Sequence, residues 1–214
     1  MIKNYFFDFD GTLADSGKAA VIATKAAFKD QGLPEPSSSQ IRGYMGIPIE
    51  RSFILMGAKG LDEAGAQAMF TSFRKHYQAN ELANVVLFPG IRETLLNLKK
   101  AGKQLYVVSS KHSEALKRNL ELLEIDVFFD DLVGSDQVKN YKPAPDGINI
   151  LLDRYKLDPT ESVMIGDAIY DIQMGHAAGV KTAGVYWGAF DWDKVLAQKP
   201  TYALETVAQL TKLK

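Results

Sequence analysis

The spacing of apolar and polar positions divides the chain into an alternating α/β part and a purely helical part. Strand-like runs, most of them largely apolar as is typical of buried strands, occupy residues 5–9, 105–108, 162–165 and 181–185. From Pro89 onward these runs alternate with helical patterns. This order favours a parallel sheet with crossover helices. A further short strand is expected within residues 128–134.

Residues 16 to 80 show only helical periodicity. Ser16 is the expected N-cap of an alanine-rich helix, which Gly32 ends. Further helices are expected near Ile41, over residues 49–56 and over residues 62–79, with a return linker over residues 81–88. The segment therefore reads as a small helical insertion that directly follows the first strand.

We predict an α/β fold with a Rossmann-like parallel sheet and a small all-helical cap domain inserted after the first strand. The core domain would comprise residues 1–15 and 81–214, and the cap residues 16–80. Residues 181–185 are expected to be the last strand, followed by short pieces and a final helix over residues 204–213. Ligands of open α/β sheets bind at the carboxyl ends of the strands, so polar residues at those ends are the candidate site.

The composition is that of an ordinary globular protein, with 46% apolar and 24% charged residues among 214. A net charge of −1 offers no field that favours nucleic acid or an anionic membrane. The absence of cysteine excludes disulfides and thiolate metal sites. We find neither a signal-peptide pattern nor an apolar run of membrane-spanning length. We therefore expect a cytoplasmic protein, either a monomer or a homodimer.

The first strand ends in two carboxylates, Asp8 and Asp10, which an extended chain places on the same side. Gly11 then allows a sharp turn close to a ligand. Neighbouring carboxylates repel unless a cation or proton lies between them, and such oxygen ligands suit Mg²⁺. An aspartate can also attack phosphorus. The alternative is an acidic turn without chemistry, since Asp and Gly are common turn residues.

Two further strands are followed by polar residues whose pattern alone leaves two roles open. Ser109 and Ser110 precede a helix, where hydroxyls form either an anion site or a helix cap. Asp167 and Asp171 lie four residues apart at another helix start, so they share one face. Acidic residues at the start of a helix either stabilise the helix end as caps, or take part in metal binding or catalysis.

Four motifs, in order, resemble those of the haloacid dehalogenase-like (HAD) phosphohydrolases. Residues 8–13 resemble the first motif, Asp-x-Asp-Gly-Thr-Leu, and Ser109 at a strand end matches the second. Lys142 lies in Lys-Pro-x-Pro-Asp, which resembles the third motif and sets it apart from Lys139. Residues 166–171 resemble the fourth motif, Gly-Asp-x-x-x-Asp, although its third residue is alanine where the family often has Ser or Thr.

The resemblance implies a Mg²⁺-dependent phosphatase with the HAD fold. Asp8 would attack the phosphate and form an aspartyl-phosphate, and Asp10 would serve as general acid and then general base. Asp8, the backbone carbonyl of Asp10, and Asp167 would hold Mg²⁺. Asp171 would support the metal indirectly or through water.

The same resemblance implies how the transferring phosphoryl group would be bound. Ser109 and Lys142 would contact its oxygens, and Lys142 would also offset the charge of the nucleophile. Backbone N–H groups near Phe9 and Ser110 would complete the cradle.

The size and place of the helical insertion, with the loop Tyr44-Met45-Gly46-Ile47-Pro48, resemble the phosphoglycolate phosphatase-like branch. The candidate substrate residues in this cap are Arg42, Tyr44, Met45 and Arg51. An arginine there would hold a substrate carboxylate, as phosphoglycolate requires. The alternative is that the arginines are solvated charges and that the other two residues pack within the cap.

The expected partner is a small phosphorylated metabolite similar to phosphoglycolate. Inorganic pyrophosphate, a sugar phosphate or a nucleotide is the alternative substrate on the same scaffold. A catalytically silent phosphate-binding regulator is the alternative of a different class. A phosphomutase is disfavoured by Gly11-Thr12-Leu13 and the Gly-Ile-Pro loop, and a dehalogenase by the presence of Asp10 and Asp167.

Overall fold

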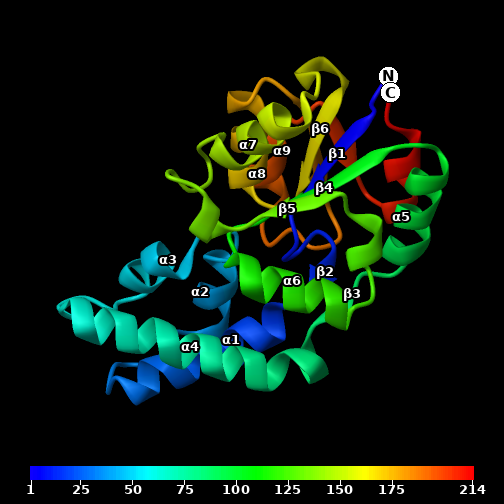
Figure 1. Ribbon diagram of the computed structural model, residues 1–214. Coiled ribbons are helices and arrows are strands. Elements are labelled where there is room, and N and C mark those ends of the chain that lie inside the picture. The colour runs from blue at the N-terminus through cyan, green and yellow to red at the C-terminus, as the bar shows by residue number, and fades with distance from the viewer.

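The computed structural model describes residues 1–214, in which a six-stranded sheet is flanked by helices and joined to a separate helical unit (Figure 1). The strands are parallel and lie in the order β5-β4-β1-β6-β7-β8. Their bounds are β1 Asn4–Phe7, β4 Gln104–Val108, β5 Asp131–Val133, β6 Ser162–Gly166, β7 Lys181–Val185 and β8 Tyr202–Leu204. The predicted α/β class with a Rossmann-like parallel sheet is confirmed.

Both faces of the sheet are buried, which explains why its central strands β1, β4 and β6 are mostly apolar. Successive strand residues point to opposite faces: Tyr5 and Phe7 of β1 join one core cluster, and Phe6 joins another. The first cluster lies under α5 (Ile91–Lys100), α6 (Ser113–Leu122) and the 3₁₀ helix η4 (Val207–Lys212). The second lies under α7 (Asp146–Tyr155) and α8 (Ile169–Ala177), with α9 (Trp192–Ala197) packed beside α8.

Short 3₁₀ helices connect several of these elements. They are η1 (Asp126–Phe128), η2 (Ser135–Gln137) and η3 (Pro159–Glu161). The two chain termini lie close together, at the opposite end of the sheet from the helical unit (Figure 1).

The helical unit contains α1 (Gly17–Asp30), α2 (Ser38–Gly43), α3 (Ile49–Leu55) and α4 (Glu63–Asn84). It has its own apolar core, which includes Phe28, Phe53 and Met69. The chain enters and leaves it through an antiparallel ribbon of β2 (Ala14–Asp15) and β3 (Val86–Leu87). The helices thus follow the first strand of the sheet, whereas the residue at which one domain ends and the other begins stays a prediction.

The predicted end of the last cap helix near Ala79 is wrong, because α4 continues to Asn84. Glu81 gives the physical reason. Its carboxylate is buried and accepts hydrogen bonds from Arg118 and, at 2.7 Å, from Asn119, both on α6. These contacts order the segment that we expected to be a linker.

One prediction for the C-terminal segment is wrong, because β8 follows β7 and the strand over residues 181–185 is therefore not the last. The predicted final helix is present as the 3₁₀ helix η4, which is shorter than the expected range of residues 204–213. Val207, Leu210 and Leu213 are buried, and their spacing of three residues matches the 3₁₀ period.

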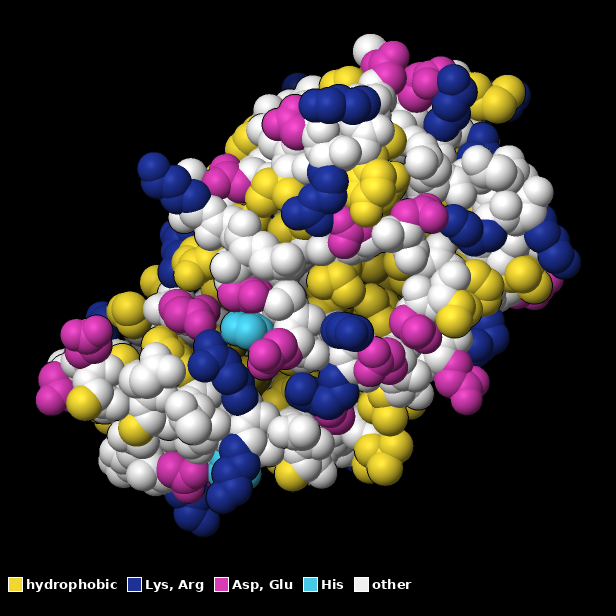
Figure 2. Space-filling model, in the orientation of Figure 1, with side chains coloured by type: hydrophobic (Ala, Val, Ile, Leu, Met, Phe, Trp, Pro, Cys, Tyr) yellow, Lys and Arg dark blue, Asp and Glu magenta, His cyan; other side chains and the backbone are white.

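None of the helices combines the length and apolar character that a membrane span requires. On the face shown in Figure 2, basic and acidic side chains are interspersed and do not gather into regions of one sign.

Candidate active site

The carboxyl ends of three neighbouring strands bring the predicted motif residues together. β1 lies between β4 and β6, so residues that follow these strands share one edge of the sheet. Asp8 follows β1, Ser109 follows β4, and Asp167 follows β6. This edge faces the helical unit (Figure 1).

Lys142 joins two carboxylates within the protein interior. Its ammonium donates to Asp8 Oδ1 at 2.9 Å and to Asp171 Oδ1 at 2.7 Å. The exposed fractions of the Lys142, Asp8 and Asp171 side chains are 4%, 3% and 0%. Burial alone would lower the pKa of Lys142, but Asp171 and Asp8 raise it above its usual range. Lys142 is therefore a fixed positive charge, whereas Lys139 is exposed.

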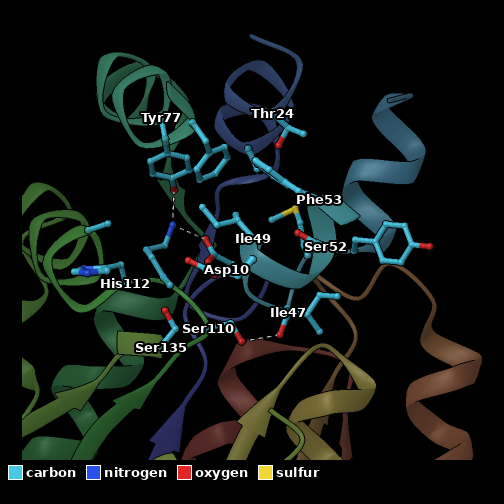
Figure 3. A pocket seen from close by; sticks show the side chains of 18 of the residues that line it. Asp10, Thr24, Ile47, Ile49, Ser52, Phe53, Tyr77, Ser110, His112 and Ser135 are labelled. Atoms are coloured by element: carbon cyan, nitrogen blue, oxygen red, sulfur yellow. Dashed lines mark hydrogen bonds and ion pairs between the residues drawn. The ribbon is translucent and has the colours of Figure 1, made fainter. Parts of the chain in front are cut away.

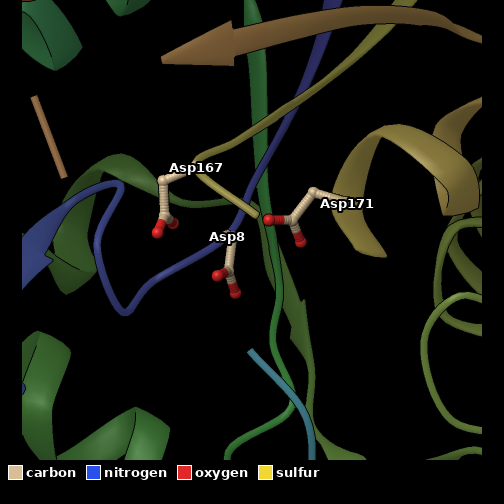
Figure 4. A group of neighbouring side chains, drawn as sticks. All are labelled: Asp8, Asp167 and Asp171. Atoms are coloured by element: carbon tan, nitrogen blue, oxygen red, sulfur yellow. The ribbon is translucent and has the colours of Figure 1, made fainter. Parts of the chain in front are cut away.

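Asp8, Asp167 and Asp171 form a cluster of neighbouring carboxylates (Figure 4). Each offers an oxygen within 4.8 Å of the others. Burial raises the pKa of Asp8 to about 7, because Lys142 offsets only part of the combined effect of burial, Asp171 and Asp10. Burial, with the charges of Asp171 and Asp8, also raises the pKa of Asp167 well above its usual range. Such a cluster suits a divalent cation with oxygen ligands.

The carboxylate of Asp10 is not part of this cluster, and only its backbone carbonyl was predicted to hold a metal. Ser16 Oγ donates to Asp10 Oδ1, and Lys111 Nζ lies 3.2 Å from the same oxygen. Lys111 also donates to the hydroxyl of Tyr77 on α4 at 2.7 Å. The prediction that Ser16 is the N-cap residue of α1 is confirmed, but its hydroxyl makes no capping hydrogen bond and donates to Asp10 instead.

The residues predicted to bind phosphate leave donors available at the end of β4 and after β1. Ser109 is 5% exposed, and its Oγ accepts from Lys111 N at 3.2 Å. The backbone N–H groups of Phe9 and Ser110 have no backbone acceptor. The ring of Phe9 is fully buried, and the Ser110 hydroxyl donates to Gly46 O at 2.8 Å. These two residues therefore offer their amides to an anion, not their side chains.

Two cavities adjoin Asp10, and they separate the predicted cap residues. One, of about 130 Å³, extends under the helical unit (Figure 3). The other is an open cleft of about 750 Å³ that Asp167 also lines. Tyr44 and Met45 line both cavities.

The two predicted arginines lie elsewhere. Arg42 lines only the open cleft. Arg51 is exposed and lines neither cavity. Contact of either arginine with a substrate stays a prediction, and for Arg51 neither cavity supports it.

Sequence reasoning gave no site role to Thr12, Lys111 and Tyr77. Thr12 Oγ1 donates to Asp167 Oδ1 at 2.9 Å, and Trp187 Nε1 donates to Thr12 O at 3.0 Å. Thr12 lies within the first motif and Lys111 directly follows Ser110, so their positions in the sequence could have indicated a place in the site. Tyr77 lies in the middle of α4 and has no such signal.

The fold and site define an α/β enzyme with an acidic, lysine-bearing centre under a helical insertion. Residues 5–185 match the family model described as haloacid dehalogenase-like hydrolase, and the chain belongs to this family. Its sequence is 35% identical to that of a pyrophosphatase PpaX from Bacillus velezensis over 205 residues, which cover 95% of this chain and 92% of that protein.

Two further relatives agree with this assignment. A phosphoglycolate phosphatase from Aquifex aeolicus is 34% identical over 97% of this chain and 94% of that protein. A solved structure from Bacteroides fragilis, assigned to the haloacid dehalogenase-like hydrolases, has a TM-score of 0.91 and 30% identity, covering 98% of this chain and 100% of that one. The predicted family and its phosphoglycolate phosphatase-like branch are confirmed.

Proposed function

We propose that this haloacid dehalogenase-like phosphatase hydrolyses a small phosphate monoester through an aspartyl-phosphate on Asp8, with Mg²⁺ as cofactor. The observation that carries the proposal is the buried contact of Asp8 with Lys142 beside the carboxylates of Asp167 and Asp171. Phosphoryl transfer depends mainly on positioned charges. This arrangement supplies a nucleophile, a fixed cation and metal ligands at one edge of the sheet.

The acidic cluster fits Mg²⁺ by the chemistry of its donors. Its carboxylate oxygens are ligands that Mg²⁺ prefers, and the raised pKa values of Asp8 and Asp167 indicate a repulsion that a divalent cation would relieve. We expect Asp8, Asp167 and the backbone carbonyl of Asp10 to hold the ion. Asp171, which accepts a hydrogen bond from Lys142, would support the bound ion indirectly or through water. When bound, Mg²⁺ neutralises charge on the transferring phosphoryl group.

The side chains of Asp8 and Asp10 divide the chemistry between them. A carboxylate oxygen of Asp8 attacks phosphorus, and the bond from phosphorus to the leaving oxygen breaks with its electron pair on that oxygen. Asp10, in its protonated form, gives its proton to the leaving oxygen. It then takes a proton from the water that hydrolyses the aspartyl-phosphate, which releases phosphate and regenerates Asp8.

The remaining site residues would hold the phosphoryl oxygens in place. Ser109 and the unpaired N–H groups of Phe9 and Ser110 offer donors, and Lys142 offers a positive charge beside Asp8. Preorganised donors of this kind stabilise the charge of the transition state.

The test is phosphate release from a panel of monoesters and pyrophosphate, with Mg²⁺ or with EDTA. We expect release only with Mg²⁺, and we expect Asp8→Asn to lower it by at least about 10³-fold, because the nucleophile is lost. Asp153→Asn, at an exposed position on α7, is the matched control and should keep wild-type activity. Release that persists in Asp8→Asn would refute the nucleophile assignment.

Pyrophosphate is a second candidate substrate because one relative, 35% identical over 95% of the chain, is named a pyrophosphatase. The relative from Aquifex aeolicus, which is 34% identical, is named a phosphoglycolate phosphatase. The panel contains both compounds, so their relative rates decide between them. Binding of phosphate or Mg²⁺ without turnover of any compound would instead support a phosphate-binding regulator.

A further inference from the structure

The cavity of about 130 Å³ beside Asp10 has an apolar wall on the side of the helical unit (Figure 3). That wall includes Ile41, Ile47, Ile49, Phe53, Met56 and Phe73, and the ion pair of Glu50 and Arg74 also lines the cavity. On the side of the sheet the cavity is lined by Asp10, Ser110 and Lys111. It is therefore continuous with the residue that is proposed to protonate the leaving oxygen.

Every lysine and arginine that lines this cavity already has a carboxylate partner. The pairs are Lys111 with Asp10, Arg74 with Glu50, and Arg118 with Glu81. A leaving group with its own carboxylate or phosphate would meet no arginine without a carboxylate partner here, and Lys111 is also held by the hydroxyl of Tyr77. Burying such a charge without a partner is unfavourable.

The arginines that would recognise a substrate carboxylate do not line the cavity. Arg42 lines the open cleft, and Arg51 lines neither space. Ile49, the first residue of α3, lines the cavity and is apolar.

The cavity also contains two buried hydroxyl groups, those of Thr24 and Ser52, which are 2% and 4% exposed. In Figure 3 no dashed line joins either of them to another side chain that is drawn. Hydroxyls in this position can form hydrogen bonds with a neutral polar group of a ligand.

We propose that this cavity binds the leaving group of the substrate, and that this group is uncharged with an apolar body about the size of a benzene ring. The inference rests on the proposed phosphatase function. An apolar cavity of about 150 Å³ in another protein holds benzene, and about 130 Å³ is available here. The ester bond breaks at the bridging oxygen, Asp10 supplies the proton, and the products are phosphate and a neutral alcohol.

The first test compares kcat/KM for benzyl phosphate, ethyl phosphate, phosphoglycolate and pyrophosphate with the Mg²⁺-loaded wild-type protein. Benzyl phosphate should exceed each of the others by at least about tenfold, since its ring would bury an aromatic apolar surface in the cavity. A preference for phosphoglycolate or pyrophosphate over benzyl phosphate would overturn the proposal while leaving the phosphatase assignment intact.

A pair of variants tests whether the cavity wall sets this preference. Ile49→Arg places a cation on the wall, and we expect it to shift the ratio of kcat/KM for phosphoglycolate over benzyl phosphate upward by at least about tenfold. Ile49→Met keeps the wall apolar and should leave the ratio close to that of wild type. If Arg42→Ala changes the ratio and Ile49→Arg does not, the open cleft holds the leaving group and the proposal is wrong.

Binding of inert analogues separates failure of this inference from failure of the proposed function. Benzylphosphonate and phosphonoacetate carry an apolar and a carboxylate group, respectively, on a phosphonate that is not hydrolysed. Benzylphosphonate should raise the Tm of the Mg²⁺-loaded protein more than phosphonoacetate does at equal concentration, even if no ester is turned over. An equal or reversed order would contradict an apolar leaving-group pocket.

Discussion

Lys142 balances two buried carboxylates that come from different parts of the chain, those of Asp8 and Asp171. Replacing it by methionine keeps much of its bulk and removes the charge. Removing one member of a buried ionic group costs about 3–5 kcal/mol, because the remaining charges lack a partner. We therefore expect Lys142→Met to lower the free energy of unfolding by that order in EDTA, and to reduce phosphate release strongly, as measured by urea denaturation and by activity.

The exposed neighbour Lys139 provides the control, since Lys139→Met should change neither quantity by more than about 0.5 kcal/mol or twofold. Adding Asp171→Asn to Lys142→Met removes one of the stranded charges, so part of the lost stability should return without return of activity. A Lys142→Met protein as stable as wild type would show that the lysine does not hold the carboxylates together.

At the scale of elements, the turn after β1 is shaped by a close approach between Gly11 and Asp167. Gly11 has a φ of +81°, and a Cβ at this position would lie 2.2 Å from Asp167 Oδ2. Gly32, after α1, has a φ of +66° with nothing within 4 Å. We expect Gly11→Ala and Gly32→Ala each to lose about 1 kcal/mol of stability from backbone strain. Only Gly11→Ala should displace Asp167.

The readout that separates the two glycines is the Mg²⁺ dependence of activity. Gly11→Ala should raise the Mg²⁺ concentration required for half-maximal activity by at least about tenfold, because Asp167 is a proposed ligand. Gly32→Ala should leave it unchanged. Equal effects of both substitutions would mean that backbone strain alone, and not the contact with Asp167, accounts for the loss.

Elements with long apolar runs or strong caps could be predicted from the sequence, and short ones could not. β1 and β6 are buried on both faces, and apart from Asn4 and Ser162 at their starts their residues are apolar or glycine. β8 has three residues at the edge of the sheet and is specified by its pairing with β7, which no local pattern encodes. The contact of Lys111 with Tyr77 likewise depends on how α4 packs over the sheet edge, which is a tertiary feature.

The site residues divide in the same way. Asp8, Ser109 and Asp167 could be named because each follows an apolar strand and lies in a motif, and parallel strands place such residues on one edge. The sequence does not predict which cap residues line each of the two cavities, because this depends on which cap side chains face Asp10. Arg42 and Ile49 are close in sequence, yet only Ile49 lines the cavity under the helical unit.

At the scale of the whole molecule, the acidic cluster makes the stability of the metal-free protein depend on pH. The pKa of Asp8 is raised from 3.8 to about 7 in the folded protein, and that of Asp167 is raised in the same direction. A carboxyl with a raised folded-state pKa favours folding fully below its unfolded pKa. That contribution is lost as pH rises through its folded pKa, because the unfolded chain releases the proton more readily.

In EDTA we therefore expect Tm to fall as the pH is raised from about 5 to about 8. With saturating Mg²⁺ the ionised carboxylates gain a partner, so the fall should be reduced or reversed and Tm at pH 8 should rise. Asp8→Asn cannot ionise at this position, so its Tm in EDTA should depend less on pH than that of wild type, which separates the effect of Asp8 from that of other titrating groups. A wild-type Tm in EDTA that rises across this interval, or that Mg²⁺ leaves unchanged at pH 8, would show that the cluster is not the strained metal site that its geometry indicates.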